Sequence, residues 1–283
     1  MDKSLNFNIP APTLTVTAQA GRPVLGDFLQ ITLFTVGDFE ALMTFALQKA
    51  ADLESALDLE NESSEISKLL NIQGDDTSEI SEAVGEVIEE ALYLSTLSSR
   101  TFDLFREDAG LWEVKSLIRG YIIDQTVKCL TEHELTLRGV VQLAEGMRFF
   151  NCPKSSIHVR TGSDVTREIV LLKDGISTTN GRGSPFDQES TVVYLQPLRR
   201  GISSKYTVSV IADTCMSANA LANIGLYAEP EVVQACVNDL KAQLIVFNEK
   251  GDVVDFYEEK SLKAYSSDQL NTSYSPYDDS SKD

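Results

Sequence analysis

The sequence is short of the residue types that most often perform chemistry at neutral pH. Its 283 residues include two histidines, one tryptophan and four cysteines. No two of the cysteines stand close enough to form the paired clip of a zinc site, so zinc is not expected. Cysteines scattered through a chain of this length are typical of reduced core residues; they are Cys129, Cys152, Cys215 and Cys236.

Positive charge is also scarce, because 24 lysines and arginines face 43 acids and leave a net charge of −19. An acidic body repels phosphate backbones and anionic lipids, so we expect neither nucleic acid nor a membrane as a partner. The charge is compatible with cation binding, although a solvated acidic surface is the simpler explanation. The sequence does not indicate an oligomeric state.

No apolar run has the length of a signal peptide or a membrane span. We therefore expect a cytoplasmic protein from the chain as given, or a periplasmic one if an export signal has been removed. The hydrophobic content of 42% is enough for a substantial core.

Apolar spacing predicts helices first and strands later. Period 3.6 predicts helices over 38–57, 64–71, 81–95 and 118–130, with Asp38 and Ser81 as caps. Residues 101–105 and 111–112 read as irregular. Alternation predicts strands over 25–35, 137–143, 147–150, 157–160, 169–172, 192–195 and 206–211. A helix follows over 218–226, another begins at Pro230, and 244–257 reads as a hairpin. Helices, a mainly antiparallel sheet, then two helices and a hairpin indicate an α+β fold.

The stretch Ala212–Ala228 is the strongest candidate for a site. It follows a buried apolar run, and a helix places Asn219 and Asn223 on one face, one turn apart. Two amides just beyond a strand end favour a binding site. A helix with two solvated asparagines would give the same pattern.

Five stretches together resemble the ApbE family, the FAD:protein FMN transferases. Thr214–Asn223 is similar to the family's T-C-M-E-A-D-A-L-A-T, Ser64–Asn71 to S-E-I-S-R-L-N, Arg119–Asp124 to K-G-Y-A-V-D, Thr101–Asp103 to F-D-P-T, and Thr178–Gly181 to A-T-S-G. They occur in the family's order. The resemblance implies an ApbE-like flavin transferase domain over 23–257. Composition predicts an arm or partial edge strand over 1–22 and a disordered acidic tail over 258–283.

By resemblance, such a protein binds FAD with Mg²⁺ and moves FMN onto a Ser or Thr of a target flavoprotein, releasing AMP. The family's metal ligands, an Asp and a Thr, correspond here to Asn219 and Asn223. An amide lacks the formal charge of a carboxylate, which is worth on the order of several kcal/mol beside a close cation. We expect FAD to remain possible as a ligand, and Mg²⁺ binding to be weakened.

The family's base histidine corresponds to Val193, which cannot take a proton, so no catalytic residue is assigned. His133 and His158 lie elsewhere in the pattern and are not expected to replace it. Two glycines of the family's flavin-facing loop correspond to Lys115 and Ser116. Their side chains limit how closely the backbone can approach a flavin.

The residues kept from the family pattern imply a nucleotide site. They are Asn71, Arg119, Gly120, Tyr121 and Thr179. Asn71 could instead end a helix, Arg119 could form an ion pair, and Asp124 could anchor a helix. We therefore predict a degenerate member that binds a flavin nucleotide or a partner with weak or lost transfer. The alternatives are an active transferase with an altered metal site, and an interaction protein whose cleft is unused.

Overall fold

The computed structural model describes residues 16–71, 80–103, 110–134, 137–153, 156–161, 165–180 and 206–259. Its helices are α1 (Glu40–Leu57), α2 (Glu65–Leu70), α3 (Glu82–Leu97), α4 (Gly110–His133), α5 (Cys215–Tyr227) and α6 (Pro230–Asp239). Its strands are β1 (Ala18–Val24), β2 (Asp27–Leu33), β3 (Gly139–Leu143), β4 (Gly146–Phe150), β5 (Ser156–Arg160), β6 (Thr166–Val170), β7 (Gly175–Asn180), β8 (Thr207–Ala212), β9 (Gln243–Phe247) and β10 (Val253–Glu258).

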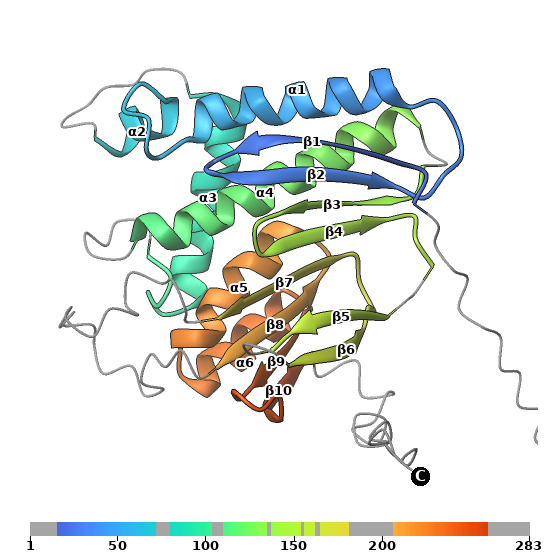
Figure 1. Ribbon diagram of the computed structural model, residues 1–283. Coiled ribbons are helices and arrows are strands. Elements are labelled where there is room, and N and C mark those ends of the chain that lie inside the picture. The colour runs from blue at the N-terminus through green and yellow to red at the C-terminus, as the bar shows by residue number, and fades with distance from the viewer. Residues whose placement is uncertain are drawn as a thin grey trace, which may run out of the picture.

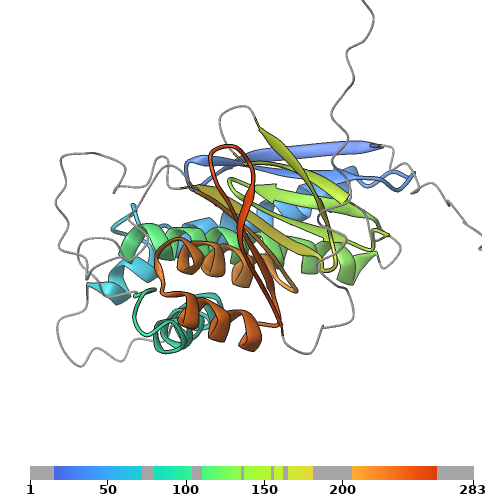
Figure 2. The ribbon, with the colours of Figure 1, turned by 90° about the horizontal axis from the view of Figure 1, so that it is seen from below.

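Eight strands form one antiparallel sheet in the order β1-β2-β3-β4-β7-β8-β9-β10, with β5 and β6 as a separate hairpin. The helices gather on one face of the sheet (Figure 1 and Figure 2). This confirms the predicted α+β class and the predicted hairpin of β9 and β10. None of the described helices is long and apolar enough to cross a membrane.

The sheet has a different core on each of its faces. The larger core lies between the sheet and the helices. On the opposite face, the β5–β6 hairpin lies in front of the lower strands (Figure 1) and closes a smaller apolar cluster that includes Ile169, Ile176 and Phe247. The strands β7 and β8 are therefore covered on both faces, and they give α5 a buried platform.

Helix starts follow local side-chain chemistry. Ser64 and Ser81 cap α2 and α3 by accepting the backbone N–H three residues later, as predicted for Ser81. The prediction that Asp38 caps α1 is wrong. Phe39 occupies the cap position, and the Asp38 carboxylate accepts instead from the N–H of Glu40 at 3.3 Å.

Three sequence-based element boundaries differ from the structure. The strand expected from Leu25 begins at Asp27, because Leu25 and Gly26 form a turn with φ of 50° and 79°. β1 pairs with β2 and occupies 18–22 of the segment expected to be an arm or partial edge strand. Residues 111–112 belong to α4 rather than to irregular structure. Because α1, α3, α5 and the sheet all contact α4, no single apolar stripe marks its start.

Strand β7 was not predicted, and its composition explains why. Its sequence GISTTN has one large apolar side chain, yet Ser177 is fully buried and Thr179 is 8% exposed. Small polar residues in a strand covered on both faces do not give the alternating pattern that a half-exposed strand gives. The strand predicted over 192–195 lies outside the described residues.

Candidate functional site

The N-terminus of α5 is fixed to α4 by a buried carboxylate. The two oxygens of Asp124 accept the backbone N–H groups of Cys215 and Met216, both at 2.9 Å. Arg148 donates to Asp124 Oδ1 at 2.8 Å from the neighbouring strand β4. Burial raises the pKa of Asp124, and Arg148 and the two N–H groups oppose that rise. Asp124 therefore anchors a helix, which was the alternative role considered for it.

Gly120 lies where α4 crosses the start of α5. A Cβ added to Gly120 would stand 2.5 Å from Met216 Cα and 2.7 Å from the Cys215 carbonyl oxygen. Relieving such a clash would require the backbone of α5 to shift, which costs free energy, so the crossing requires glycine at position 120. The structure thus accounts for Gly120 through helix packing, although the resemblance implied a ligand contact.

Asn219 is completely buried between α5, α4 and β4. Its Nδ2 donates to the Ser116 carbonyl at 2.9 Å, and its Oδ1 lies 3.8 Å from the Cys215 thiol. A Cβ added to Gly146 would stand 2.7 Å from Asn219 Oδ1, so β4 also closes on this amide. Burial raises the pKa of Cys215 well above its usual range, which suits a packing role rather than a reactive one.

Asn223 lies one turn further along α5 and is 2% exposed. Its Nδ2 donates to the Asn219 carbonyl at 3.2 Å, while its Oδ1 is buried without a hydrogen-bond partner. Strand alternation directs Ser177 and Thr179 toward α5, because Ile176 faces the opposite core. Ser177 Oγ is likewise buried and unpartnered. A strip of small polar groups therefore runs between α5 and β7.

The amide pair does not fit a magnesium site in the described part of the chain. Mg²⁺ is usually bound through one or two carboxylates in octahedral geometry. Here the amide pair supplies neutral oxygens only, and no group of three or more His, Cys, Asp or Glu residues able to hold a metal occurs among the described residues. Two acids that could replace the missing ligand, Asp27 and Asp213, are already paired with Arg119 and Lys173.

Arg119 is the centre of a charged cluster next to this strip. It forms ion pairs with Asp27 and with Glu145, the second at 3.3 Å. Ser116 Oγ donates to the other Glu145 oxygen at 2.7 Å, and the Ser116 carbonyl binds Asn219. We call these four side chains, Asp27, Ser116, Arg119 and Glu145, the Arg119 cluster. The two carboxylates neutralise the single guanidinium, and only 13% of the arginine side chain is exposed. The cluster therefore leaves no unpaired positive charge for a phosphate.

Sequence reasoning predicted Arg119 but missed Glu145. The only signal was that Gln142–Gly146 departs from the family's glycine-rich N-x-G-G-D at the matching place. The turns before β2 and before β4 lie at the same end of the sheet because β2 and β3 pair antiparallel. That pairing places Asp27 and Glu145 near one side chain of α4, which no linear spacing shows.

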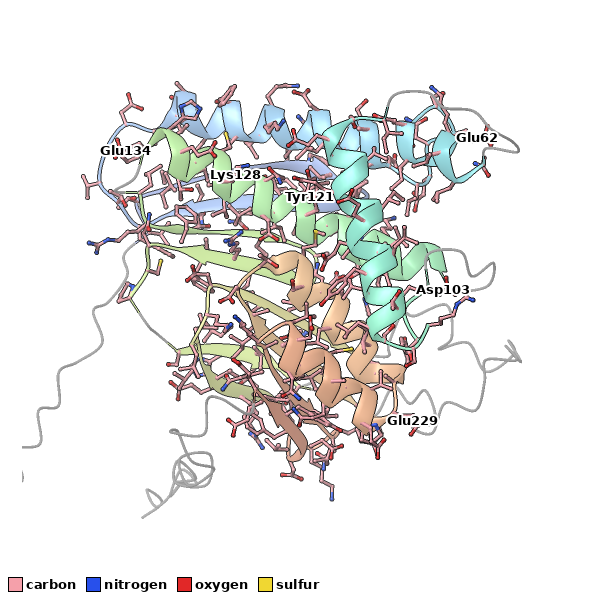
Figure 3. All side chains as sticks on the ribbon, turned by 180° about the vertical axis from the view of Figure 1, so that it is seen from behind. Glu62, Asp103, Tyr121, Lys128, Glu134 and Glu229 are labelled. Atoms are coloured by element: carbon pink, nitrogen blue, oxygen red, sulfur yellow. The ribbon has the colours of Figure 1, made fainter. Side chains whose placement is uncertain are left out.

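Two of the residues implied to bind a nucleotide have other contacts. Tyr121 lies on α4 beside α3 (Figure 3), and its hydroxyl donates to Glu86 at 2.6 Å. Burial and Glu86 raise the pKa of Tyr121. Asn71 forms the C-cap of α2 and donates to the Ser67 carbonyl at 2.8 Å, so it does end a helix. Neither contact joins the Arg119 cluster.

Both histidines lie in described parts of the chain, His133 on α4 and His158 on β5. Val193 lies outside the described residues. The ring of His133, at the end of α4, packs edge-on against Phe45 at 5.4 Å. His158 is exposed on β5, on the hairpin that covers the other face of the sheet.

Comparison with solved structures identifies the fold. The flavin transferase ApbE from Vibrio cholerae aligns with a TM-score of 0.64 at 14% identity, over 88% of this chain and 99% of that one. The ApbE protein from Thermotoga maritima gives 0.66 at 15% identity, over 87% and 98%. The apo flavinyl transferase ApbE from Pseudomonas stutzeri gives 0.62 at 15% identity, over 87% and 95%.

The sequence itself matches no protein-family model and no curated protein. At 14–15% identity, the structural likeness shows the fold and leaves the activity to be argued from the residues. The ApbE-like fold predicted from five short motifs is confirmed, and the chain is divergent within it.

Proposed function

We propose that this protein is a degenerate ApbE-like flavin transferase that binds a flavin nucleotide or a partner protein and transfers FMN weakly or not at all. Asn219 is the observation that carries this proposal. At the position where the family pattern has an acid, its buried amide joins α5 to α4 through Ser116. With Nδ2 held by that carbonyl, and with Oδ1 facing the Cys215 thiol at 3.8 Å, Asn219 offers a cation one neutral, buried oxygen in place of a carboxylate.

The reaction in question forms a phosphoester between FMN and a Ser or Thr hydroxyl, breaks the pyrophosphate bond of FAD and releases AMP. It needs charge stabilisation at the pyrophosphate and a base at the incoming hydroxyl. The described residues offer paired acids around Arg119 instead of a free cation, and Val193 stands at the family's base position. Both features support weak or lost transfer.

An active transferase with an altered divalent-metal site is the second candidate. Asn223 favours it, because a buried amide oxygen without a partner is the kind of atom that a ligand or ion satisfies. Under this alternative, transfer would proceed with a divalent ion held by an altered set of ligands.

Calorimetry and a transfer assay separate the two candidates. The full chain is titrated with FAD, FMN and ADP, and it is then incubated with FAD, a divalent ion and a flavoprotein domain carrying an acceptor Ser or Thr. We expect flavin binding without AMP release or a covalent adduct. AMP and adduct formed with Mn²⁺ or Mg²⁺ would establish the second candidate.

The double variant Asn219→Asp/Asn223→Thr tests the metal positions directly. We expect tighter Mg²⁺-dependent FAD binding, with transfer still absent because Val193 remains. The control is Asp213→Asn, which changes an exposed acid paired with Lys173 and should leave FAD binding unchanged.

A further inference from the structure

Glu145 makes a contact with Arg119 of the kind that an anionic ligand would make. It accepts from Arg119 Nη1 at 3.3 Å through one oxygen and from Ser116 Oγ at 2.7 Å through the other. A carboxylate and a phosphate are both anionic acceptors for an arginine, and Glu145 uses one of its oxygens in this way. Arg119 Nε is buried without a hydrogen-bond partner, so the guanidinium is not saturated by its two acids.

Glu145 stands on a turn, so its side chain can leave Arg119 without breaking a hydrogen bond between the strands. Glu145 and Ala144 form the two-residue turn between β3 and β4, and Ala144 has a φ of 51°, which is strained for a residue with a Cβ. Asp27, the other acid of the Arg119 cluster, follows the equivalent turn between β1 and β2 and has 37% of its side chain exposed.

We propose that Glu145 is a built-in competitor for Arg119 that sets the affinity of the cluster for diphosphate groups. A diphosphate reaches the guanidinium only by displacing this carboxylate, and the remaining negative charge of Asp27 opposes its approach. The inference deepens the proposed function, since the diphosphate it concerns is the one in a flavin dinucleotide.

The test compares two variants that each convert one acid near Arg119 to its amide. Glu145→Gln removes the competing charge and keeps an acceptor for Ser116. Glu60→Gln is the matched control, because Glu60 is exposed and paired with Lys115 at 2.6 Å. Its pKa is lowered mainly by Lys115 and slightly by Arg119, so it senses the same guanidinium without contacting it.

Inorganic pyrophosphate and ADP are the calorimetric probes, used with the full chain at fixed ionic strength. We expect Glu145→Gln to bind both at least about tenfold more tightly than the wild type, and Glu60→Gln to stay within about twofold. Equal tightening in the two variants, or none in a folded Glu145→Gln protein, would overturn the proposal. If Glu145→Gln fails to fold, Asp27→Asn takes its place, and an unchanged affinity in that variant overturns it equally.

The outcome is independent of flavin binding. Tighter pyrophosphate binding by Glu145→Gln, with no binding of FAD or FMN by any variant, would support the role of Glu145 and refute flavin binding as the proposed function. Flavin binding by the wild type, with no effect of Glu145→Gln on pyrophosphate affinity, would support the proposed function and refute the role of Glu145.

Discussion

The amide at position 219 donates a buried hydrogen bond that a carboxylate could not donate. Asn219 donates to one carbonyl, that of Ser116, and lies against the thiol of Cys215 in a site with no exposure to water. A carboxylate there would face the Ser116 carbonyl as a second acceptor and would carry an uncompensated buried charge. Glu145, which Ser116 also binds, would add a second negative charge nearby.

Replacing Asn219 by Asp should therefore destabilise the protein. We expect Asn219→Asp to lower the free energy of unfolding by about 3 kcal/mol at pH 7, measured by urea denaturation. The loss should be smaller at pH 5, because burial raises the pKa of an acid and the folded state then holds the proton more tightly than the unfolded state.

An exposed Asn provides the control for this substitution. Asn61 uses its Oδ1 to accept the Ser63 N–H at 3.0 Å, and Asn61→Asp keeps that acceptor. We expect a change within about 0.5 kcal/mol. An Asn219→Asp protein as stable as the wild type at both pH values would show that the amide is not needed as a donor.

Among the elements, the crossing of α4 and α5 determines the geometry of the site. Asp124 of α4 binds the start of α5, and Gly120 allows the two helices to approach closely. One turn further on, Ser116 and Asn219 join the same two helices. Small shifts of either helix would therefore move Arg119 and the amide pair together.

Gly120→Ala should disturb this crossing, whereas a second helical glycine should tolerate the same change. With backbone atoms 2.5 Å from the added Cβ, we expect a loss of about 2–3 kcal/mol in thermal or urea unfolding. At Gly85 in α3 the nearest atom is 3.9 Å away, so Gly85→Ala should be neutral or stabilising by up to about 1 kcal/mol. Similar losses in both variants would refute the close approach of α4 to α5.

A tyrosine joins α3 to α6 on the outer side of the helix layer. The Tyr93 hydroxyl donates to Asp239, and this hydrogen bond is the main reason that the pKa of Tyr93 rises to about 12. The raised value means that the contact stabilises the fold below pH 10 and is lost as the pH rises from 10 to about 12.

The pKa of Tyr93 can be measured by following tyrosinate absorbance against pH in the wild type and in Tyr93→Phe. The difference between the two curves is the titration of Tyr93. We expect the difference signal to titrate near pH 12, and to move toward pH 10 when Asp239→Asn is present in both proteins. A midpoint near 10 in the wild-type background would show that α3 and α6 are not joined in this way.

For the molecule as a whole, local patterns predicted the fold better than the site. Helix caps at Ser81, the β9–β10 hairpin and the order of helices before strands follow from residues adjacent in sequence. The Arg119 cluster joins two turns and a helix, so its acids are 92 and 26 residues from the arginine. Contacts at that separation depend on strand pairing, which spacing within one segment cannot reveal.

On an ApbE-like fold, the described residues place a buried amide at Asn219 and an arginine at Arg119 that is paired with two acids. The fold has the extent of the solved ApbE structures, since the alignments cover 95–99% of those chains.

A transfer assay is the most direct test of this account. The full chain is incubated with FAD, Mg²⁺ or Mn²⁺ and a flavoprotein domain bearing an acceptor Ser or Thr, while AMP and the flavin–protein adduct are measured by chromatography and mass spectrometry. The account predicts flavin binding by calorimetry but neither AMP nor adduct above the level of a control without protein. Stoichiometric AMP and covalent flavin with either ion would contradict it.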